Sequence, residues 1–172
     1  MYLDSDADLR NWIKTELTTD QRQKIEPLLK ADASERRSLD RLITARRFVC
    51  PSLALANRVA QNNHNKVFVY QFDRIRPGIV AKTMGAYHGA ELPYTFDTHD
   101  TWLPTDDKDR ELTLKIQRFW ANFIKTGNPN DEQGQTEWPR FNSGHPVILT
   151  LDTNPDIKSH SSQELCAILE SD

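Results

Sequence analysis

The sequence predicts an α/β fold that is mostly helical, with one strong sheet strand and a short strand or hairpin near its C-terminal end. Apolar residues recur at three- and four-residue steps through residues 1–62 and 109–126, the period of amphipathic helices. Residues 66–73 are instead dense in β-branched and aromatic side chains, which favours a strand. With 172 residues, 37% hydrophobic and 27% charged, the chain is long enough for about one globular domain.

Helix signals follow one another through residues 1–62. Asp32 and Glu35 have the spacing of a capping box. We expect Pro27 to end or bend the helix that precedes this box, because proline has no backbone N–H to donate. Pro51 suits the first turn of a new helix over residues 53–60.

The strand at residues 66–73 is followed by a long structured loop. Its near-continuous apolar character suits a strand that is covered on both faces, as in a parallel α/β sheet. From residue 74 to 108 the Pro, Gly, Asp and Thr content rises and neither period holds, so we expect at most about one helical turn there. Loops of such length are usually functional or covered, which directs attention to residues 84–96 inside it.

The C-terminal part contains the clearest helix and weaker strand signals. Residues 109–126 present one broad apolar face, and Gly127 follows as a helix stop. Residues 138–151 are expected to hold the terminal strands, and residues 162–169 a final short helix. One strong strand cannot form a sheet alone, so we expect the apolar faces to find partners outside this sequence.

Composition excludes several functional classes. The net charge is -3 and the basic residues are scattered among acidic ones, so nucleic acid is an improbable partner. No run approaches the roughly 18 apolar residues of a membrane span, and the first residues are acidic where a secretory signal is basic and then apolar. Cys50 and Cys166 are too few for a disulfide-built scaffold and are not spaced as a metal site, and the residues alone leave pairing and free thiols equally open.

One histidine differs from the others in its surroundings. His88 lies between Gly85 and Gly89, and glycines let a backbone take positive φ and present an imidazole at a fixed angle, which suits a general base. Spacing alone favours a plainer interpretation, a turn histidine that bonds a carbonyl. A metal site with Glu91 is a weak alternative, because two ligands without a further cluster are too few. The remaining histidines occupy polar turns, where we expect them to be solvated: His64, His99, His145 and His160.

A set of motifs resembles the type-B carboxylesterases, the family that includes the cholinesterases. The string GAYHGAELPYTF at 85–96 resembles the family's histidine motif, and VYQFD at 69–73 its last sheet strand. FVCP at 48–51 resembles the helix entry upstream of that strand. IQRFWANFIKTGNPN at 116–130 and WPRF at 138–141 resemble the C-terminal helix and the strand entry. Because the motifs occur in the family's order over nearly the whole chain, the resemblance implies the C-terminal part of an α/β-hydrolase fold.

The resemblance implies that His88 is the base of a Ser-His-Glu or Ser-His-Asp triad in a serine esterase. The nucleophile of such a triad sits in Gly-x-Ser-x-Gly and precedes the histidine in the chain. The six glycines of this sequence are at 78, 85, 89, 127, 134 and 144, and no pair of them brackets a serine in that way. The acid is also expected upstream, since Asp4, Asp6 and Asp8 are better explained as helix-start charges.

The resemblance carries further expectations. It implies that Glu91 is a buried carboxylate that holds the histidine loop, and that Cys50 pairs with Cys166. Such a pair favours an extracytoplasmic or secreted location. No cofactor is expected, the substrate is a small ester, and the partner is the missing N-terminal part of the hydrolase domain. Two alternatives remain: a catalytically dead, cholinesterase-like adhesion module, and a truncated product without a function of its own.

Overall fold

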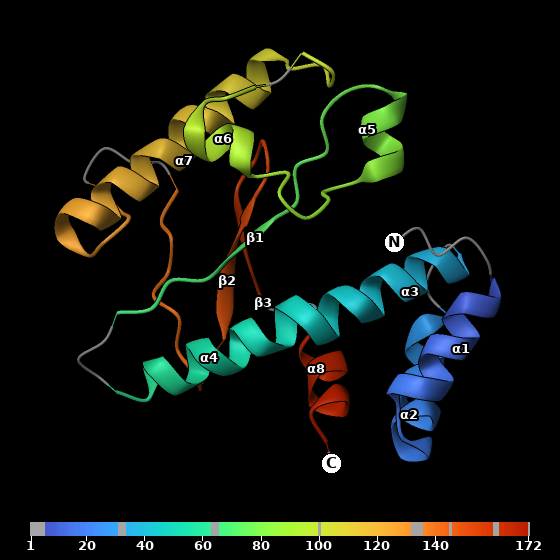
Figure 1. Cartoon of the computed structure of the whole chain (residues 1–172). Coiled ribbons are helices and arrows are strands. Elements are labelled where there is room, and N and C mark those ends of the chain that lie inside the picture. The colour runs from blue at the N-terminus through green and yellow to red at the C-terminus, as the bar shows by residue number, and fades with distance from the viewer. Residues whose placement is uncertain are drawn as a thin grey trace. The chain divides into compact units, whose positions relative to one another are not determined.

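The computed structural model describes residues 6–30, 34–62, 66–99, 101–131, 136–144, 146–159 and 162–171 (Figure 1). The chain divides into two compact units. The first unit is Met1–Arg58 together with His160–Asp172, and the second is Val59–Ser159. The candidate histidine therefore belongs to the second unit, and the two cysteines belong to the first.

The first unit is helical. Its elements are α1 (Asp6–Glu16), α2 (Thr19–Leu29), α3 (Glu35–Thr44), the π-helical turn η1 (Ala45–Val49), most of α4 (Cys50–Ala60), and α8 (Gln163–Leu169). The α1–α2 connection is short, and Thr18 caps α2 in a reciprocal capping box with Gln21. Ile25 and Leu42 are fully enclosed in one apolar cluster to which α8 adds Leu165 and Leu169. The apolar stripes of these helices thus bury one another, as their period predicts.

Pro51 lies in the first turn of α4 as predicted, and Pro27 differs from the prediction. Pro27 lies inside α2, which continues to Leu29, because a proline in the last turn removes only one helical hydrogen bond. The helix that contains Pro51, α4, follows α3 and η1 without a break. The widened turn ends at Val49, two residues before Pro51, with the Cys50 N–H donating to the Ala45 carbonyl five residues back. A widened turn gives room to a proline ring that otherwise collides with the preceding turn of an α-helix.

A disulfide joins Cys50, the first residue of α4, to Cys166 in α8. The two Cα atoms are 5.3 Å apart, and both side chains are buried in the apolar cluster of the first unit. The bond spans 116 residues of sequence, so it closes a loop that contains the whole second unit.

The second unit contains a three-stranded sheet in the order β1-β2-β3. β1 (Tyr70–Phe72) pairs in parallel with β2 (Val147–Leu151), with Tyr70 opposite Leu149. β2 pairs in antiparallel fashion with β3 (Asp156–Ser159), as Figure 1 shows. The strand expected at 66–73 therefore has a sheet partner within this chain, β2.

The strand boundaries differ from those expected. β1 is shorter than residues 66–73, and Tyr70 remains 37% exposed rather than covered on both faces. Among the described residues of the predicted span, 138–144 and 146–151, the strand is Val147–Leu151. Pro139 cannot donate to a strand ladder, and the turn in which the Asn142 side chain accepts from the Gly144 N–H precedes β2. β3 lies beyond the predicted span.

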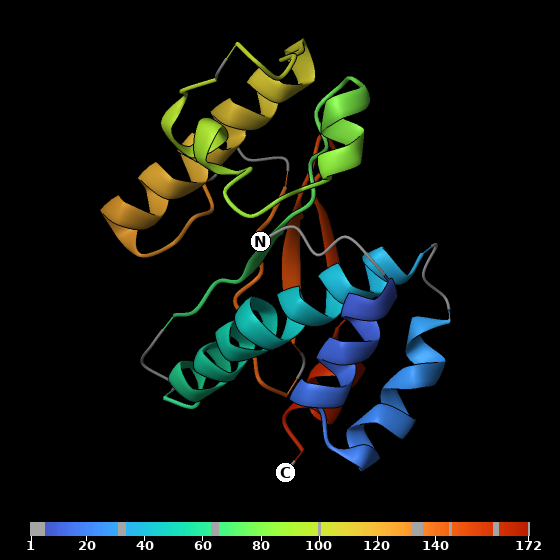
Figure 2. The same ribbon diagram turned by 45° about the vertical axis from the view of Figure 1, so that its right-hand side comes forward.

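Three helices complete the second unit: α5 (Ile79–Met84), α6 (Leu92–Phe96) and α7 (Asp107–Thr126). The expected loop from 74 to 108 thus holds two short helices. α7 begins two residues before the predicted start, because Asp106 and Asp109 form a reciprocal capping box, and it ends at Gly127 with φ 70°. α6 lies alongside α7 in both views (Figures 1 and 2). Between the helices and the sheet, Tyr94, Leu112, Ile116 and Leu149 are almost fully enclosed.

None of the helices in the described part of the chain has the length and apolar character needed to cross a membrane.

Candidate active site

His88 sits on a tight turn between α5 and α6. The Gly85 N–H closes α5 by donating to the Ala81 carbonyl at 2.9 Å. The turn itself is closed by the Ala90 N–H, which donates to the Tyr87 carbonyl at 2.9 Å. His88 lies inside this turn and its side chain is exposed. The imidazole is thus carried by a hydrogen-bonded backbone and can meet a reacting group that approaches from outside.

Both glycines beside the histidine adopt backbone angles that other residues rarely take. Gly85 has φ 65° and Gly89 has φ 91°. A Cβ atom built on Gly89 lies 3.6 Å from Leu92 Cδ1, which is ordinary van der Waals contact. The need for glycine at this position is therefore conformational rather than a matter of space.

Glu91 supports the turn through its main chain. Its carbonyl accepts the N–H groups of Tyr94 and Thr95, both at 3.0 Å, at the start of α6. The residue is half-buried rather than enclosed, and its side chain does not cap the helix. Burial, followed by the nearby Glu91 charge, raises the pKa of the Tyr70 hydroxyl. The expectation was a buried Glu91 carboxylate, whereas these loop contacts are made by the Glu91 backbone carbonyl.

A second histidine is not solvated as predicted. The Thr113 hydroxyl donates to the Asp109 carbonyl at 2.9 Å, so its oxygen accepts from His99 Nε2 at 2.7 Å. His99 Nδ1 is buried and has no hydrogen-bond partner in the described part of the chain. Burial, and then the charge of Arg76, lower the pKa of His99, because protonation would place a second N–H in that site. His64, His145 and His160 lie outside the described residues.

A buried polar cluster lies close to the histidine turn. The carboxylate of Asp109, at the start of α7, accepts from Arg74 Nε at 2.7 Å and from the Tyr94 hydroxyl at 2.7 Å. Asp109 and Tyr94 are both 0% exposed. Arg74 also reaches Asp106 at 3.2 Å. The spacing of the two aspartates is a capping-box signal that the predicted helix start at residue 109 did not use, and nothing in the sequence links them to Arg74.

Charge and burial oppose each other in this cluster. Burial alone would raise the pKa of Asp109, but the hydrogen bond from Arg74, with those from the Asp106 backbone and Tyr94, holds it below its ordinary value. Burial and then the hydrogen bond to Asp109 raise the pKa of Tyr94. The aspartate is therefore a carboxylate and the tyrosine a donor throughout the ordinary pH range.

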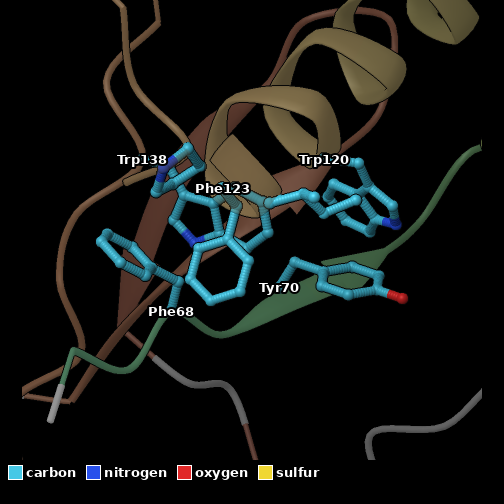
Figure 3. Close-up of a pocket in the computed structure, with 7 residues that line it drawn as sticks. Phe68, Tyr70, Trp120, Phe123 and Trp138 are labelled. Carbon is cyan, nitrogen blue, oxygen red and sulfur yellow. The ribbon is translucent and has the colours of Figure 1, made fainter. Parts of the chain in front are cut away.

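A cavity of about 270 Å³ opens between β1 and α7. It is lined by aromatic and other apolar side chains: Phe68, Tyr70, Trp120, Phe123, Ile124, Pro129 and Trp138 (Figure 3). Trp138 holds the group together, with its ring centroid 5.8 Å from Tyr70 and 5.5 Å from Trp120. Phe123 is 45% exposed, which is unusual for an aromatic residue in a preformed cavity.

His88 lines neither this cavity nor a smaller one beneath its turn. The two sequence-nominated acids that the structure includes, Asp6 and Asp8, fall in α1 of the first unit, and Asp4 lies outside the described residues. No group of three His, Cys, Asp or Glu side chains that could hold a metal ion occurs in the ranges that the structure describes.

A strand followed by a glycine-flanked histidine turn, in a mixed sheet with a long covering helix, is the arrangement found in esterases of the α/β-hydrolase fold. Over 98% of its length the chain superposes on a solved PNB esterase, at 26% sequence identity and a TM-score of 0.70. The model of the carboxylesterase family matches residues 4–169, and the chain belongs to this family.

Relatives of known name agree with this membership. An acetylcholinesterase from Bungarus fasciatus is 32% identical over 128 residues, which is 70% of this chain and 20% of that protein. Carboxylesterase 4A from Bos taurus is 36% identical over 96 residues, 53% of this chain and 17% of that protein. The chain thus spans about a fifth of the length of these relatives, and 35% of the solved PNB esterase.

Proposed function

We propose that this chain supplies the general base of a serine carboxylic ester hydrolase, and that His88 is that base. The observation that carries the proposal is an exposed imidazole on a turn closed by hydrogen bonds and flanked by two positive-φ glycines, in a chain of the carboxylesterase family. The substrate class is a small carboxylic ester, and no cofactor takes part.

The chemistry divides between this chain and polypeptide outside it. In acylation His88 takes the proton of a serine hydroxyl as the serine oxygen bonds the ester carbonyl carbon, and then gives that proton to the departing alcohol. In deacylation it takes a proton from water and returns it to the serine. The serine comes from outside these 172 residues, since no Gly-x-Ser-x-Gly occurs among them. In the chain order of such triads the carboxylate that orients the imidazole lies between the serine and the histidine, and we propose that it too comes from outside this chain.

We propose further that this outside polypeptide docks along the outer edge of β1. Val69 and Asp73 form hydrogen bonds toward β2, with Leu149 N at 3.1 Å from Val69 O and Asp73 N at 3.0 Å from Leu151 O. Backbone groups alternate in direction along a strand, so those of Tyr70 point away from β2. β1 is the end strand in the sheet order of the described residues.

The aromatic cavity supports this docking. Tyr70 begins β1, Phe68 lies two residues before it, and both line the cavity together with side chains of α7. A strand added beside Tyr70 can place alternate apolar side chains into this space, which removes both exposed aromatic surface and unpaired backbone groups from water. The share of the esterase fold that lies outside this chain is large enough to supply such a strand.

The test measures hydrolysis of p-nitrophenyl butyrate by this chain, alone and mixed with the upstream polypeptide that its own gene or transcript encodes. We expect no family-type turnover from the chain alone, turnover in the mixture, and a loss of at least about a thousandfold for His88→Ala, the size of a triad knockout. Thr98→Ala, an exposed change in the same segment, is the matched control. Hydrolysis by His88→Ala equal to that of the unchanged mixture would refute the base assignment.

The same mixture tests the docking face. On binding, the Tyr70 amide should exchange with solvent at least about tenfold more slowly, because it gains a hydrogen-bond partner. An upstream polypeptide whose elbow has no serine, together with binding but no turnover, would favour the adhesion module.

A further inference from the structure

The polar cluster of the second unit continues into the histidine turn. Tyr94, whose hydroxyl donates to Asp109 at 2.7 Å, is a residue of α6, six positions after His88. Two main-chain hydrogen bonds connect the segment from Tyr94 back to Gly89, the residue after the histidine. Tyr94 N donates to Glu91 O at 3.0 Å, and Leu92 N donates to Gly89 O at 3.1 Å.

The turn and the cluster also line one small cavity. A small cavity of about 10 Å³ is lined on one side by residues of the turn, Gly85, Tyr87 and Ala90. On the other side it is lined by members of the cluster, among them Arg74 and Tyr94. The space is about that of one water molecule, so the residues of the turn and of the cluster that line it lie close to one another.

Asp109 is the member that the others converge on. One of its carboxylate oxygens accepts from both Arg74 and Tyr94, and the other accepts from the Asp106 N–H at 2.9 Å. A carboxylate has no proton to donate, so the Tyr94 hydroxyl has one orientation open to it in this site. The position of α6 relative to α7 is thereby defined by a buried hydrogen bond with a charged acceptor.

We propose that Asp109 is a positioning residue for His88, acting through Tyr94 and neutralised by Arg74; this assignment rests on the proposed role of His88. Asp109 does not touch the imidazole or a reacting atom. It holds Tyr94, and through the main-chain hydrogen bonds between Tyr94 and Gly89 it holds the histidine turn. Asp109 thereby sets the position of the imidazole relative to the start of α7.

The test uses this chain labelled for NMR, with the variants Tyr94→Phe and Asp109→Asn and the control Asp107→Asn. Asp107 lies in the same first turn of α7 and is exposed, so its change alters the helix charge equally without touching the cluster. We expect both cluster variants to speed amide exchange at Ala90 and Leu92 at least about tenfold and to shift the His88 ring signals, with Leu149 of β2 unchanged. Asp107→Asn should leave all of these signals in place.

Activity in the mixture with the upstream polypeptide gives the second readout. We expect kcat to fall at least about tenfold in Tyr94→Phe, with KM unchanged, because orientation rather than ester binding is lost. Unchanged exchange and ring signals in Tyr94→Phe, or faster exchange at Leu149 to the same degree, would overturn the positioning role. Full activity of His88→Ala would instead overturn the proposed function and leave the exchange result standing. Should Asp109→Asn fail to fold, Tyr94→Phe, which removes one hydroxyl, decides the question.

Discussion

Asp109 shows how a single side chain can hold several elements of a fold together. Its fully buried carboxylate meets Arg74 from the chain after β1, Tyr94 from α6 and the Asp106 backbone at the start of α7. Burying a charge costs several kcal/mol unless the geometry of its partners offsets that penalty, and here every contact is at hydrogen-bond distance. Removal of one partner from this cluster should therefore destabilise the second unit, because it leaves a buried charge without compensation.

His99 makes stability depend on pH. Because its pKa in the folded chain is lowered from the ordinary value of 6.5, the unfolded chain binds a proton more readily than the folded one. The stabilisation is complete above the unfolded pKa and is lost as the pH falls through 6.5 toward the folded pKa. We expect the free energy of unfolding to decrease between about pH 7 and pH 5.

Urea unfolding at a series of pH values measures this effect. Replacement of the histidine by a group that does not titrate, His99→Gln, should flatten the curve in that window. Groups that face His99, including Arg76, Asp97 and Arg110, remain in both proteins, so they cancel in the comparison. A curve of unchanged slope in His99→Gln would show that another group is responsible.

At the scale of elements, the turn between α5 and α6 depends on the left-handed backbone of its glycines. Gly89→Ala should destabilise the second unit by about 1–2 kcal/mol, because a Cβ atom disfavours φ 91°. Gly144→Ala is the matched control, since a Cβ there has its nearest neighbour at 3.5 Å and no positive φ is recorded. The measurement is the denaturant midpoint of each variant, and equal midpoints would contradict the conformational argument.

The elements that the sequence predicted well are those with a strong local period. α7 was placed within two residues of its start and at its end, since an apolar stripe and Gly127 are both local signals. The second half of the sheet was predicted less well. β3 contains Lys158 and Asp156 beside Ile157, and its pairing with β2 depends on a neighbour rather than on its own composition. β1 is also shorter than the apolar run at 66–73, because the length of a strand depends on the neighbour with which it pairs.

The site was predictable only where its residues carry a motif. His88 with Gly85 and Gly89 is contiguous in the chain, so the string could be read directly. Arg74 and Asp109 are 35 positions apart and meet only because the strand, the turn and α7 converge. The prediction for His99 was wrong because its side-chain hydrogen-bond partner, Thr113, lies 14 positions away in the sequence, on α7.

At the scale of the whole molecule, the Cys50–Cys166 bond links stability to redox state. A bond that closes a loop of 116 residues should stabilise the fold by roughly 4–5 kcal/mol in the chain-entropy model. The double variant Cys50→Ser with Cys166→Ser should therefore melt at a lower temperature than the oxidised chain. Circular dichroism with and without reducing agent measures this, and a reductant that shifts both proteins equally would contradict it.

The location of the protein follows from the same bond only as a proposal. Such disulfides persist where the surroundings are oxidising, so we propose an extracytoplasmic or secreted protein. Free thiols at both positions in protein isolated from its native source, under alkylating conditions, would oppose it.

The crosslink has a consequence for the integrity of the polypeptide. The stretch between positions 50 and 166 is closed into a covalent ring that includes the histidine turn and α7. A protease that cuts this ring once leaves both fragments tethered, so the nicked molecule keeps its mass in a non-reducing gel. The two fragments, with the parts of the site on each, then stay at a high effective concentration relative to each other. They separate only after a reductant breaks the disulfide.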